Sequence, residues 1–211
     1  MRRTTSKRVA RKKQQTRERL LHVALGLFHE KGIYWTKIED ITERADIGKG
    51  TFYKYFPTKE ALLLTLLQQG LEELTARIRE RVRSNNEDSQ ITGQVIDAKF
   101  DFYLQRPEYL LLFHQVRGLL QLQAGHMKEL RAVYHQHLKR LAQMLSPTLK
   151  GRDHDAAAAQ DLSMVVSAFT VGLLTYHLLF DKTDQVTRDR ARLQMQIERS
   201  IHALFAIGSG H

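Results

Sequence analysis

The chain has 211 residues, of which 42% are hydrophobic and 27% are charged, so it is long enough to bury a substantial core. It contains no cysteine, which excludes disulfide bonds, thiolate metal sites and a cysteine nucleophile. The basic amino terminus has no apolar segment behind it, and no run of about 18 apolar residues is present, so we expect neither a secretory signal nor a membrane span. We therefore expect a cytoplasmic protein.

The net charge of +10 is concentrated at the start of the chain. Residues 1–19 carry nine Lys and Arg side chains and one acid, Glu18, whereas the remainder is close to neutral. A basic segment ahead of a nearly neutral body points to a polyanionic partner. A disordered solubilising tail explains the same charges, so both interpretations stay open for residues 1–16, which we predict to form a flexible basic arm.

Apolar residues recur with helical spacing from the first helix onward. The first helix ends at Lys31, because Gly32 tolerates the left-handed conformation that closes a helix. Its apolar face consists of Leu20, Val23, Ala24, Leu27 and Phe28. Thr36 and Glu39 have the spacing of a capping box and predict a short second helix.

A third helix of about two turns is predicted from Lys49 to Phe56, after the turn "DIGKG". Pro57 stops it, and Thr58 is placed to cap a long fourth helix. Five more helices follow, the fifth closed by Pro107 and the sixth over "PEYLLLFHQVRGLL". The others are expected near 127–145, 159–180 and 186–204. The predicted fold is all-α, with about nine helices.

The stretch "GKGTFYKYFPTKEAL", residues 48–62, crowds lysines, tyrosines and two glycines around the short third helix. Two short helices, a tight turn and a third short helix are the build of a helix-turn-helix, here about residues 38–57, whose last helix lies in the major groove. Lysine donates to guanine O6 and N7, and glycines let the backbone approach a phosphate. The candidate DNA contacts in this stretch are Gly48, Lys49, Gly50, Thr51, Tyr53, Lys54, Tyr55 and Lys59.

The segment "TKIEDITERADIGKGTFYKYFPTKEALL", preceded by "LLHVALGLFHEKG", closely resembles the DNA-binding domain of the tetracycline-repressor (TetR) family of bacterial transcriptional regulators. The resemblance covers about residues 17–65. It implies a phosphate contact by Thr36 and another by Lys59. It also implies recognition-helix contacts by Lys49, Gly50, Thr51, Tyr53 and Tyr55, and core positions at Phe28, Ile41, Phe52 and Phe56.

Four positions depart from the family pattern, among them Thr42, where the family commonly has alanine. Asp46 replaces the glycine usual in the turn, although aspartate tolerates a left-handed conformation. Lys37 and Gly48 stand where Ser or Thr is common, and Lys37 is a further candidate phosphate contact. The resemblance also implies a divergent helical domain over residues 66–211, which binds a small effector and dimerises through its last two long helices. An apolar or amphipathic effector would move the fourth helix and spread the DNA-binding domains.

The residues favour pairing independently of the resemblance. A heptad seam runs from Ala159 to Phe180, and the last helix has an apolar stripe. The seam would also fit inside a single subunit. The predicted interface residues are Ala159, Leu162, Val166, Phe169, Leu173, Ile197, Ile201 and Leu204. A two-fold protein reads half-sites about 34–36 Å apart, so a pseudo-palindromic operator is expected.

An effector pocket between bundle helices is expected to have apolar walls and a few polar tips. The candidate residues, each of which taken singly fits ordinary core better than ligand contact, are Phe100, Tyr103, Phe113, His114, Tyr134, His137, Phe169, Tyr176 and His177. His135 and His137 point to different faces of a helix, so no metal or other cofactor is expected. No phosphate-binding loop, nucleophile elbow or catalytic triad is present, and we expect no enzyme activity.

The sequence therefore predicts a dimeric, ligand-responsive repressor bound to double-stranded DNA, with no membrane partner. A constitutive architectural DNA-binding protein is the alternative within DNA binding, and it would show a steep salt dependence with little sequence preference. A helical-bundle enzyme or carrier is the alternative from another class. Activation instead of repression also fits the sequence.

Overall fold

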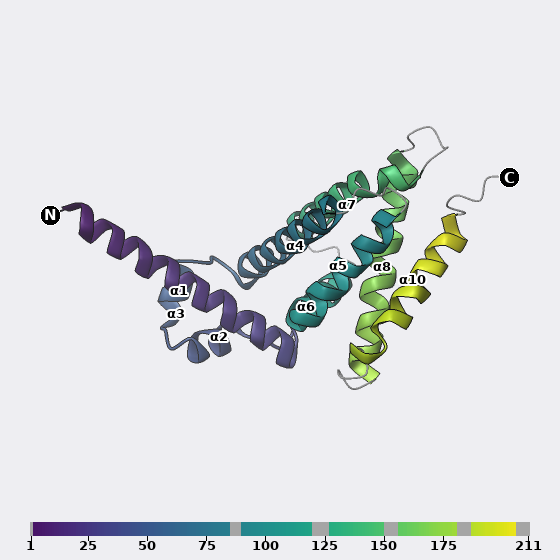
Figure 1. The fold of residues 1–211 in the computed structure, drawn as a ribbon. Coiled ribbons are helices and arrows are strands. Elements are labelled where there is room, and N and C mark those ends of the chain that lie inside the picture. The colour runs from purple at the N-terminus through teal and green to yellow at the C-terminus, as the bar shows by residue number, and fades with distance from the viewer. Residues whose placement is uncertain (1, 85–89, 120–126, 150–155, 181–186, 206–211) are drawn as a thin grey trace.

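The computed structural model describes residues 2–84, 90–119, 127–149, 156–180 and 187–205. Regular structure within these ranges is helical throughout, which confirms the predicted all-α class (Figure 1). A 3₁₀ turn, Ser146–Thr148, follows α7. The helices are α1 (Arg2–Lys31), α2 (Ile38–Arg44), α3 (Lys49–Tyr53), α4 (Lys59–Arg83), α5 (Ile91–Gln105), α6 (Pro107–Leu119), α7 (Met127–Leu145), α8 (Ala156–Phe180) and α10 (Arg190–Phe205).

Helix α1 is much longer than predicted and takes in the basic segment. It runs from Arg2 to Lys31, and its first turns project beyond the rest of the molecule (Figure 1). The reason is local, because residues 2–19 are rich in Arg, Lys and Gln and contain neither Gly nor Pro. Residues 2–16, predicted as a flexible arm, are therefore part of α1 in the structure.

We call residues 17–65 the head. Two turns and one helix cap in the head confirm predictions that were made from single residues. Gly32 has a φ of 87°, the left-handed conformation that follows α1. Asp46, in the turn between α2 and α3, has a φ of 49°. The hydroxyl oxygen of Thr58 accepts a hydrogen bond from the backbone N–H of Ala61 at 3.1 Å and so caps α4.

The start of α2 differs from the prediction. Thr36 does not cap it, because the Thr36 hydroxyl donates to the carbonyl oxygen of Gly32 at 2.7 Å and turns back toward α1. The N-cap residue is Lys37, whose backbone N–H donates to the Asp40 carboxylate at 2.7 Å. The capping box predicted from Thr36 and Glu39 is therefore wrong by one residue.

Helix α3 is also shorter than predicted. It has five residues and ends at Tyr53, before Phe56. Phe52 and Phe56 are nevertheless both buried, with ring centroids 6.0 Å apart. The two rings anchor this short helix in the core of the head, together with Phe28 and Ile41.

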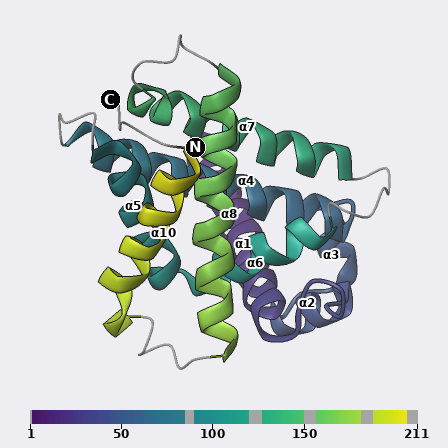
Figure 2. The same cartoon turned by 90° about the vertical axis from the view of Figure 1, so that its right-hand side faces the viewer.

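The remaining helices form the bundle, which comprises the described residues from 66 to 205. Helix α4 belongs to both regions, since its first turn lies in the head and its later turns pack on α5 and α7. Gln115 of α6 links α1 to the bundle, because its amide accepts from Ile33 N at 2.7 Å and donates to the Phe28 carbonyl oxygen at 3.2 Å. Helices α8 and α10 lie on the side away from the head (Figures 1 and 2).

Helix α8 divides the predicted heptad seam between two faces. Ala159, Leu162 and Val166 are buried within the chain, whereas Phe169 and Phe180 are exposed. A straight helix drifts by about 20° per heptad relative to a 3.5-residue repeat, so the seam turns from the inside to the outside. The seam is therefore an internal contact at its start and a surface at its end.

One helix meets the length and hydropathy criteria of a membrane span, contrary to the sequence expectation. Residues 156–178 of α8 have a mean hydropathy of 1.5, and 44% of the window is buried within the chain. Ser163, Ser167 and Thr170 on the inner face are buried, as in a core helix that packs on polar neighbours. The outer face of α8 is apolar and has no cover among the described residues.

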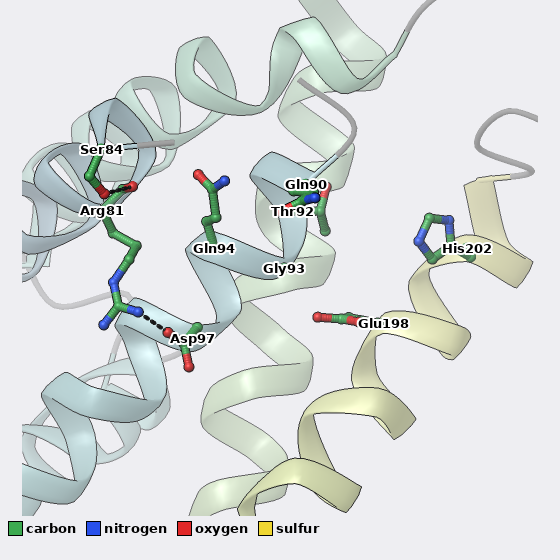
Figure 3. A pocket seen from close by; sticks show the side chains of 9 residues that line it. All are labelled: Arg81, Ser84, Gln90, Thr92, Gly93, Gln94, Asp97, Glu198 and His202. Atoms are coloured by element: carbon green, nitrogen blue, oxygen red, sulfur yellow. Dashed lines mark hydrogen bonds and ion pairs between the residues drawn. The ribbon is translucent and has the colours of Figure 1, made fainter. Parts of the chain in front are cut away.

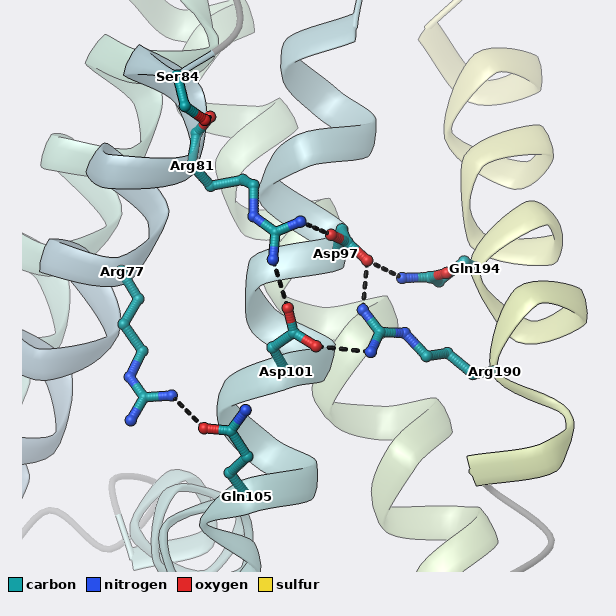
Figure 4. Close-up of polar contacts among 8 residues, drawn as sticks. All are labelled: Arg77, Arg81, Ser84, Asp97, Asp101, Gln105, Arg190 and Gln194. Carbon is teal, nitrogen blue, oxygen red and sulfur yellow. Dashed lines mark hydrogen bonds and ion pairs between the residues drawn. The ribbon is translucent and has the colours of Figure 1, made fainter.

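An ionic network holds α4, α5 and α10 together (Figure 4). Arg81 of α4 and Arg190 of α10 both pair with Asp97 and Asp101 of α5, and each contacts Asp101 at 2.5 Å. Gln194 donates to Asp97 at 2.8 Å. Burial alone would raise the pKa of Asp97, but these hydrogen bonds and charges outweigh burial and lower it. The Asp97 carboxylate is therefore held in its charged form.

Candidate nucleic-acid interface

The first residues of α3 are exposed, and no packing contact requires a glycine at either of its two glycine positions. Gly48 and Gly50 are exposed, and a Cβ placed on either would meet no atom within 4 Å. Neither glycine has a positive φ, so backbone conformation does not explain them either. What the two glycines provide is a backbone that a partner can approach closely.

Lys49 is exposed at the same end of α3 but is paired within the head. Its ammonium lies 2.6 Å from the Glu39 carboxylate, and both side chains are more than half exposed. The hydrogen bond between them lowers the pKa of Glu39 and raises the pKa of Lys49. Because both groups face solvent, a phosphate or a base edge can compete for Lys49.

Tyr53 is 53% exposed and lies beside a groove of about 310 Å³ between the head helices. Lys37 and Tyr34 line the same groove. Lys37 and Lys54 are exposed and form no ion pair with the described residues. Tyr53 and two unpaired cations are thus available on the surface of the head.

Sequence reasoning missed two exposed aromatic side chains that shortly precede Lys37 in the chain. Tyr34 is 77% and Trp35 72% exposed, and their rings meet edge to face with centroids 5.0 Å apart. Large aromatic side chains are rarely left this open without a partner. The adjacent pair "YW" after Gly32 is the signal that would have identified them.

Three of the predicted DNA contacts make contacts within the head itself. Thr36 is fully buried, so its hydroxyl is not presented to DNA. The Lys59 ammonium donates to the carbonyl oxygens of Ile33 and Thr36, each at 2.9 Å, and so holds the turn between α1 and α2. Tyr55 is only partly exposed and packs against the core. These three side chains support the head, whereas Thr51 is half-buried at its edge.

The basic part of α1 lies beside α3. The Arg17 guanidinium stacks over the Phe56 ring at 5.3 Å, which joins α1 to the residues that follow α3. Arg8, Arg11, Lys12 and Lys13 are exposed along α1 before this contact. The positive charge of the amino-terminal segment is therefore carried on the turns of α1 that precede Arg17 and extend away from the head (Figure 1).

Residues 20–66 match the family model described as "Bacterial regulatory proteins, tetR family". Over these residues the chain carries the DNA-binding domain of the TetR family. The match covers the head and the first turns of α4, which are the residues that carry the geometry described above.

Curated relatives of this chain are transcriptional regulators. CymR from Pseudomonas putida is 31% identical over 45% of this chain, and the chain spans 47% of the length of CymR. UidR from Escherichia coli (strain K12) is 23% identical over 80% of this chain and 82% of UidR. Both relatives are named as transcriptional regulators, which agrees with the function class that the sequence predicted.

Solved structures are similar to this chain over the bundle as well as over the head. FadR from Bacillus subtilis, a transcriptional regulator solved in complex with stearoyl-CoA, has a TM-score of 0.69 at 16% identity. The match covers 92% of this chain and 99% of that chain. At this identity the likeness establishes the fold of this chain, and not its ligand.

The residues predicted to bind an effector differ in how deeply they are buried. His114, Phe169 and Tyr176 are exposed and face away from the interior, so their assignment to a pocket is corrected. Tyr134 and His177 are half-buried. Phe100, Tyr103, Phe113 and His137 are buried in the bundle.

A pocket of about 580 Å³ opens where α4, α5 and α10 meet, away from all nine of those residues (Figure 3). Its walls are polar and include Arg81, Asp97, Glu198 and His202. The amide of Gln94 is buried at this pocket and has no hydrogen-bond partner among the described residues. This pocket lacks the apolar walls expected of a site for an apolar effector.

Most of the predicted dimer residues are buried within their own subunit. Ala159, Leu162, Val166, Ile197 and Ile201 are at most 4% exposed, and Leu173 is half-buried. They are buried because α8 packs on α7 and α10. Phe169 and Leu204 are the two predicted interface residues on the surface, with 39% and 62% exposure.

Sequence reasoning also missed Lys99, a buried lysine on α5. In the sequence it stands between Ala98 and Phe100 and resembles any solvent-facing lysine of an amphipathic helix. Its burial depends on neighbours from other helices and could not be recognised from the local pattern. Among the described residues, no group of three or more His, Asp or Glu side chains is arranged to hold a metal.

Proposed function

We propose that this chain is a homodimeric transcriptional repressor that acts in the cytoplasm, at the nucleoid. Each subunit places α3 in the major groove of one half of a pseudo-palindromic operator. A small amphipathic effector that binds in the bundle, within residues 66–211, releases the DNA. The contacts proposed for DNA are Lys37, Gly48, Lys49, Gly50, Thr51, Tyr53 and Lys54, with additional phosphate contacts from the basic part of α1.

The observation that carries the proposal is the exposed surface around α3. Two glycines leave the backbone open, a lysine stands at the leading end, and Tyr53 projects from a helix whose Phe52 is fully buried. A rigidly anchored helix with exposed donors suits the reading of base edges and phosphates. The α1 cations supply a further, sequence-independent attraction.

An exposed apolar face supports pairing of two subunits through α8 and α10. Met164, Phe169, Tyr176 and Phe180 of α8 are 39–71% exposed, and on α10 Met195 and Leu204 are at least half exposed. On the same face Ala168 is exposed, and Gly172 has open space where a Cβ would stand. A face of this size and composition is typical of a subunit interface, and it replaces the buried part of the predicted seam.

The connection between the two regions supports control by an effector. Helix α4 runs from the head into the bundle, and Gln115 ties α6 to the turn after α1. A molecule that shifts the bundle helices would therefore change the position of α3. The FadR neighbour was solved with stearoyl-CoA, an amphipathic molecule, which favours the same ligand class here.

The test is selection of preferred duplexes from a random pool, followed by binding measurements with two variants. Lys49→Ala and Tyr53→Ala should each weaken binding to the selected palindrome by about 10- to 100-fold, since a good base contact contributes about 1–3 kcal/mol. Lys139→Ala, which removes an exposed lysine on α7, is the matched control and should bind normally.

Each outcome distinguishes the candidate functions. A single preferred palindrome, lost in both variants, supports the proposal. Binding without sequence preference and with a steep salt dependence would instead indicate an architectural DNA-binding protein. A reporter placed behind the selected site separates repression from activation, because a repressor lowers its expression.

A further inference from the structure

Polar side chains from five bundle helices meet in the interior near Lys99. Lys99 of α5 is 1% exposed, and its nearest polar partner is the Ser167 hydroxyl of α8, 3.5 Å away. The ammonium also lies 5.7 Å from the centre of the Tyr103 ring. A contact of 3.5 Å to one hydroxyl is a weak interaction for a buried cation that has three donors.

The rest of this cluster comes from α4, α6 and α7. His137 of α7 is 4% exposed, and its Nδ1 lies 2.9 Å from the Thr75 hydroxyl of α4. Arg117 of α6 stacks over the ring of Tyr134 at 5.9 Å, and that ring lies 6.5 Å from the His137 ring. We call Thr75, Lys99, Tyr103, Arg117, Tyr134, His137 and Ser167 the buried cluster.

The buried cluster contains cations and hydrogen-bond donors but no carboxylate. Burial, reinforced by the charge of Arg117, lowers the pKa of Lys99 to about 7. Burial, followed by the charges of Lys99 and Arg140, lowers the pKa of His137 to about 3. A buried ammonium without a counter-ion is strongly unfavourable, and an anion placed beside it would remove that penalty.

Aromatic side chains pack beside the cluster. Phe102, Phe113 and Tyr109 pack against one another beside Tyr103, with ring centroids 5.8–6.4 Å apart. On the other side, a narrow cavity of about 70 Å³ between α4 and α7 reaches Thr75 and His137. Thr75 places this cavity directly against α4, the helix that continues into the head.

We propose that Lys99 is the anchor for the acidic head group of the effector, a carboxylate or phosphate carried on an apolar chain. The inference rests on the proposed role of the bundle in effector binding and specifies the ligand class. Lys99 and Arg117 supply the positive charge, and the hydroxyl groups of Tyr103, Tyr134 and Ser167 supply neutral donors. Occupation of the site pushes against α4 at Thr75 and so acts on the head.

The experiment compares head groups on one chain length, with the full-length protein and isothermal titration calorimetry. The probes are decanoate, decyl phosphate, 1-decanol and decyltrimethylammonium, each below the concentration at which it forms micelles. One of the two anions should bind at least about tenfold more tightly than 1-decanol, because a hydrogen-bonded charge contributes about 1.5–3 kcal/mol. The two anionic probes also distinguish a carboxylate effector from a phosphate effector.

Lys99→Met is the decisive variant, since it keeps an unbranched side chain of similar length and removes the charge. It should bind the anions no more tightly than 1-decanol, while its thermal stability stays the same or rises because a buried charge is gone. Lys139→Met removes an exposed lysine from α7 and should keep the full preference for the anion. A merely structural role for Lys99 predicts instead a loss of stability and no change in head-group preference.

Proton uptake provides an independent measurement. Near pH 8 Lys99 is mostly neutral, so binding of an anion should take up close to one proton, seen as an enthalpy that depends on the buffer. The other groups that face the ammonium do not compete in this range. Burial raises the pKa values of Tyr103 and Tyr134, and it lowers the pKa of His137 to about 3, so His137 is neutral.

The results separate this inference from the proposed function. Equal binding of 1-decanol and the anions, undiminished anion binding by Lys99→Met, or binding of none of the probes overturns the inference. Release of the operator by 1-decanol alone would leave the effector mechanism standing without Lys99. Anion binding that depends on Lys99 but leaves the operator complex intact would support the inference and contradict release by an effector.

Discussion

In the head, the side chains that we assign to DNA lie on the surface, whereas in the bundle the side chain that we assign to the effector lies in the interior. Tyr53 is 53% exposed, and Lys99 is 1% exposed. The head residues are nearly consecutive, because one short helix presents them. The buried cluster is assembled from five helices. A surface that one short helix presents can be recognised in the sequence. An interior cluster that several helices assemble cannot.

The largest effect of a substitution on stability is expected at Gly70, where α4 passes from the head into the bundle. An added Cβ would stand 2.4 Å from two ring atoms of Tyr109. That ring is held by Phe102, Phe113 and Arg106, so it cannot move aside. Gly70→Ala should lower the free energy of unfolding by about 2 kcal/mol, the net of overpacking and a gain in helix propensity. Thermal or chemical denaturation measures this change.

The matched control is Gly26→Ala on α1, where the added methyl group meets no atom within 4 Å. This variant should be more stable by about 0.5–1 kcal/mol, the helix propensity gain alone. If α4 couples the two regions, Gly70→Ala should also weaken operator binding while Gly26→Ala does not. Equal operator affinity in both would show that the head and the bundle act separately.

The parts of the fold that the sequence predicted depend on single residues with a strong local preference. Gly32, Asp46 and Thr58 each set a turn or cap where expected, and Pro107 begins α6. The cap of α2 was wrong because the Thr36 hydroxyl bonds to the Gly32 carbonyl, a contact that spacing alone does not reveal. Lys99 and the division of the α8 seam needed the packing of several helices, so only the structure shows them.

The second-largest effect is expected for a substitution of Lys59. This substitution distinguishes a side chain that supports the head from one that contacts DNA. Its ammonium holds two carbonyl oxygens of the turn after α1. Lys59→Met should lower the free energy of unfolding by about 1.5 kcal/mol, because hydrogen bonds from a charged group are lost and two acceptors lose their partner. The salt dependence of operator binding should stay unchanged, since no phosphate contact is removed.

Lys54→Met is the control for Lys59→Met, because Lys54 is exposed and forms no ion pair with the described residues. It should leave stability unchanged and reduce the salt slope by about one phosphate contact. The reverse pattern, with a lower slope in Lys59→Met and normal stability, would restore Lys59 to the DNA contacts that the family resemblance implies.

The smallest effect is expected at Glu39, whose carboxylate pairs with Lys49 at 2.6 Å. Lys49 must leave this pair before it contacts DNA, so Glu39→Gln should tighten operator binding by about two- to fivefold, in line with the small contribution of an exposed ion pair. Glu43→Gln removes an exposed acid of the same helix that has no ion pair with the described residues. Because both variants change the net charge equally, a larger gain in Glu39→Gln isolates the release of Lys49. Equal gains would mean that only the net charge of the head matters, and that Lys49 reaches DNA as freely as an unpaired lysine.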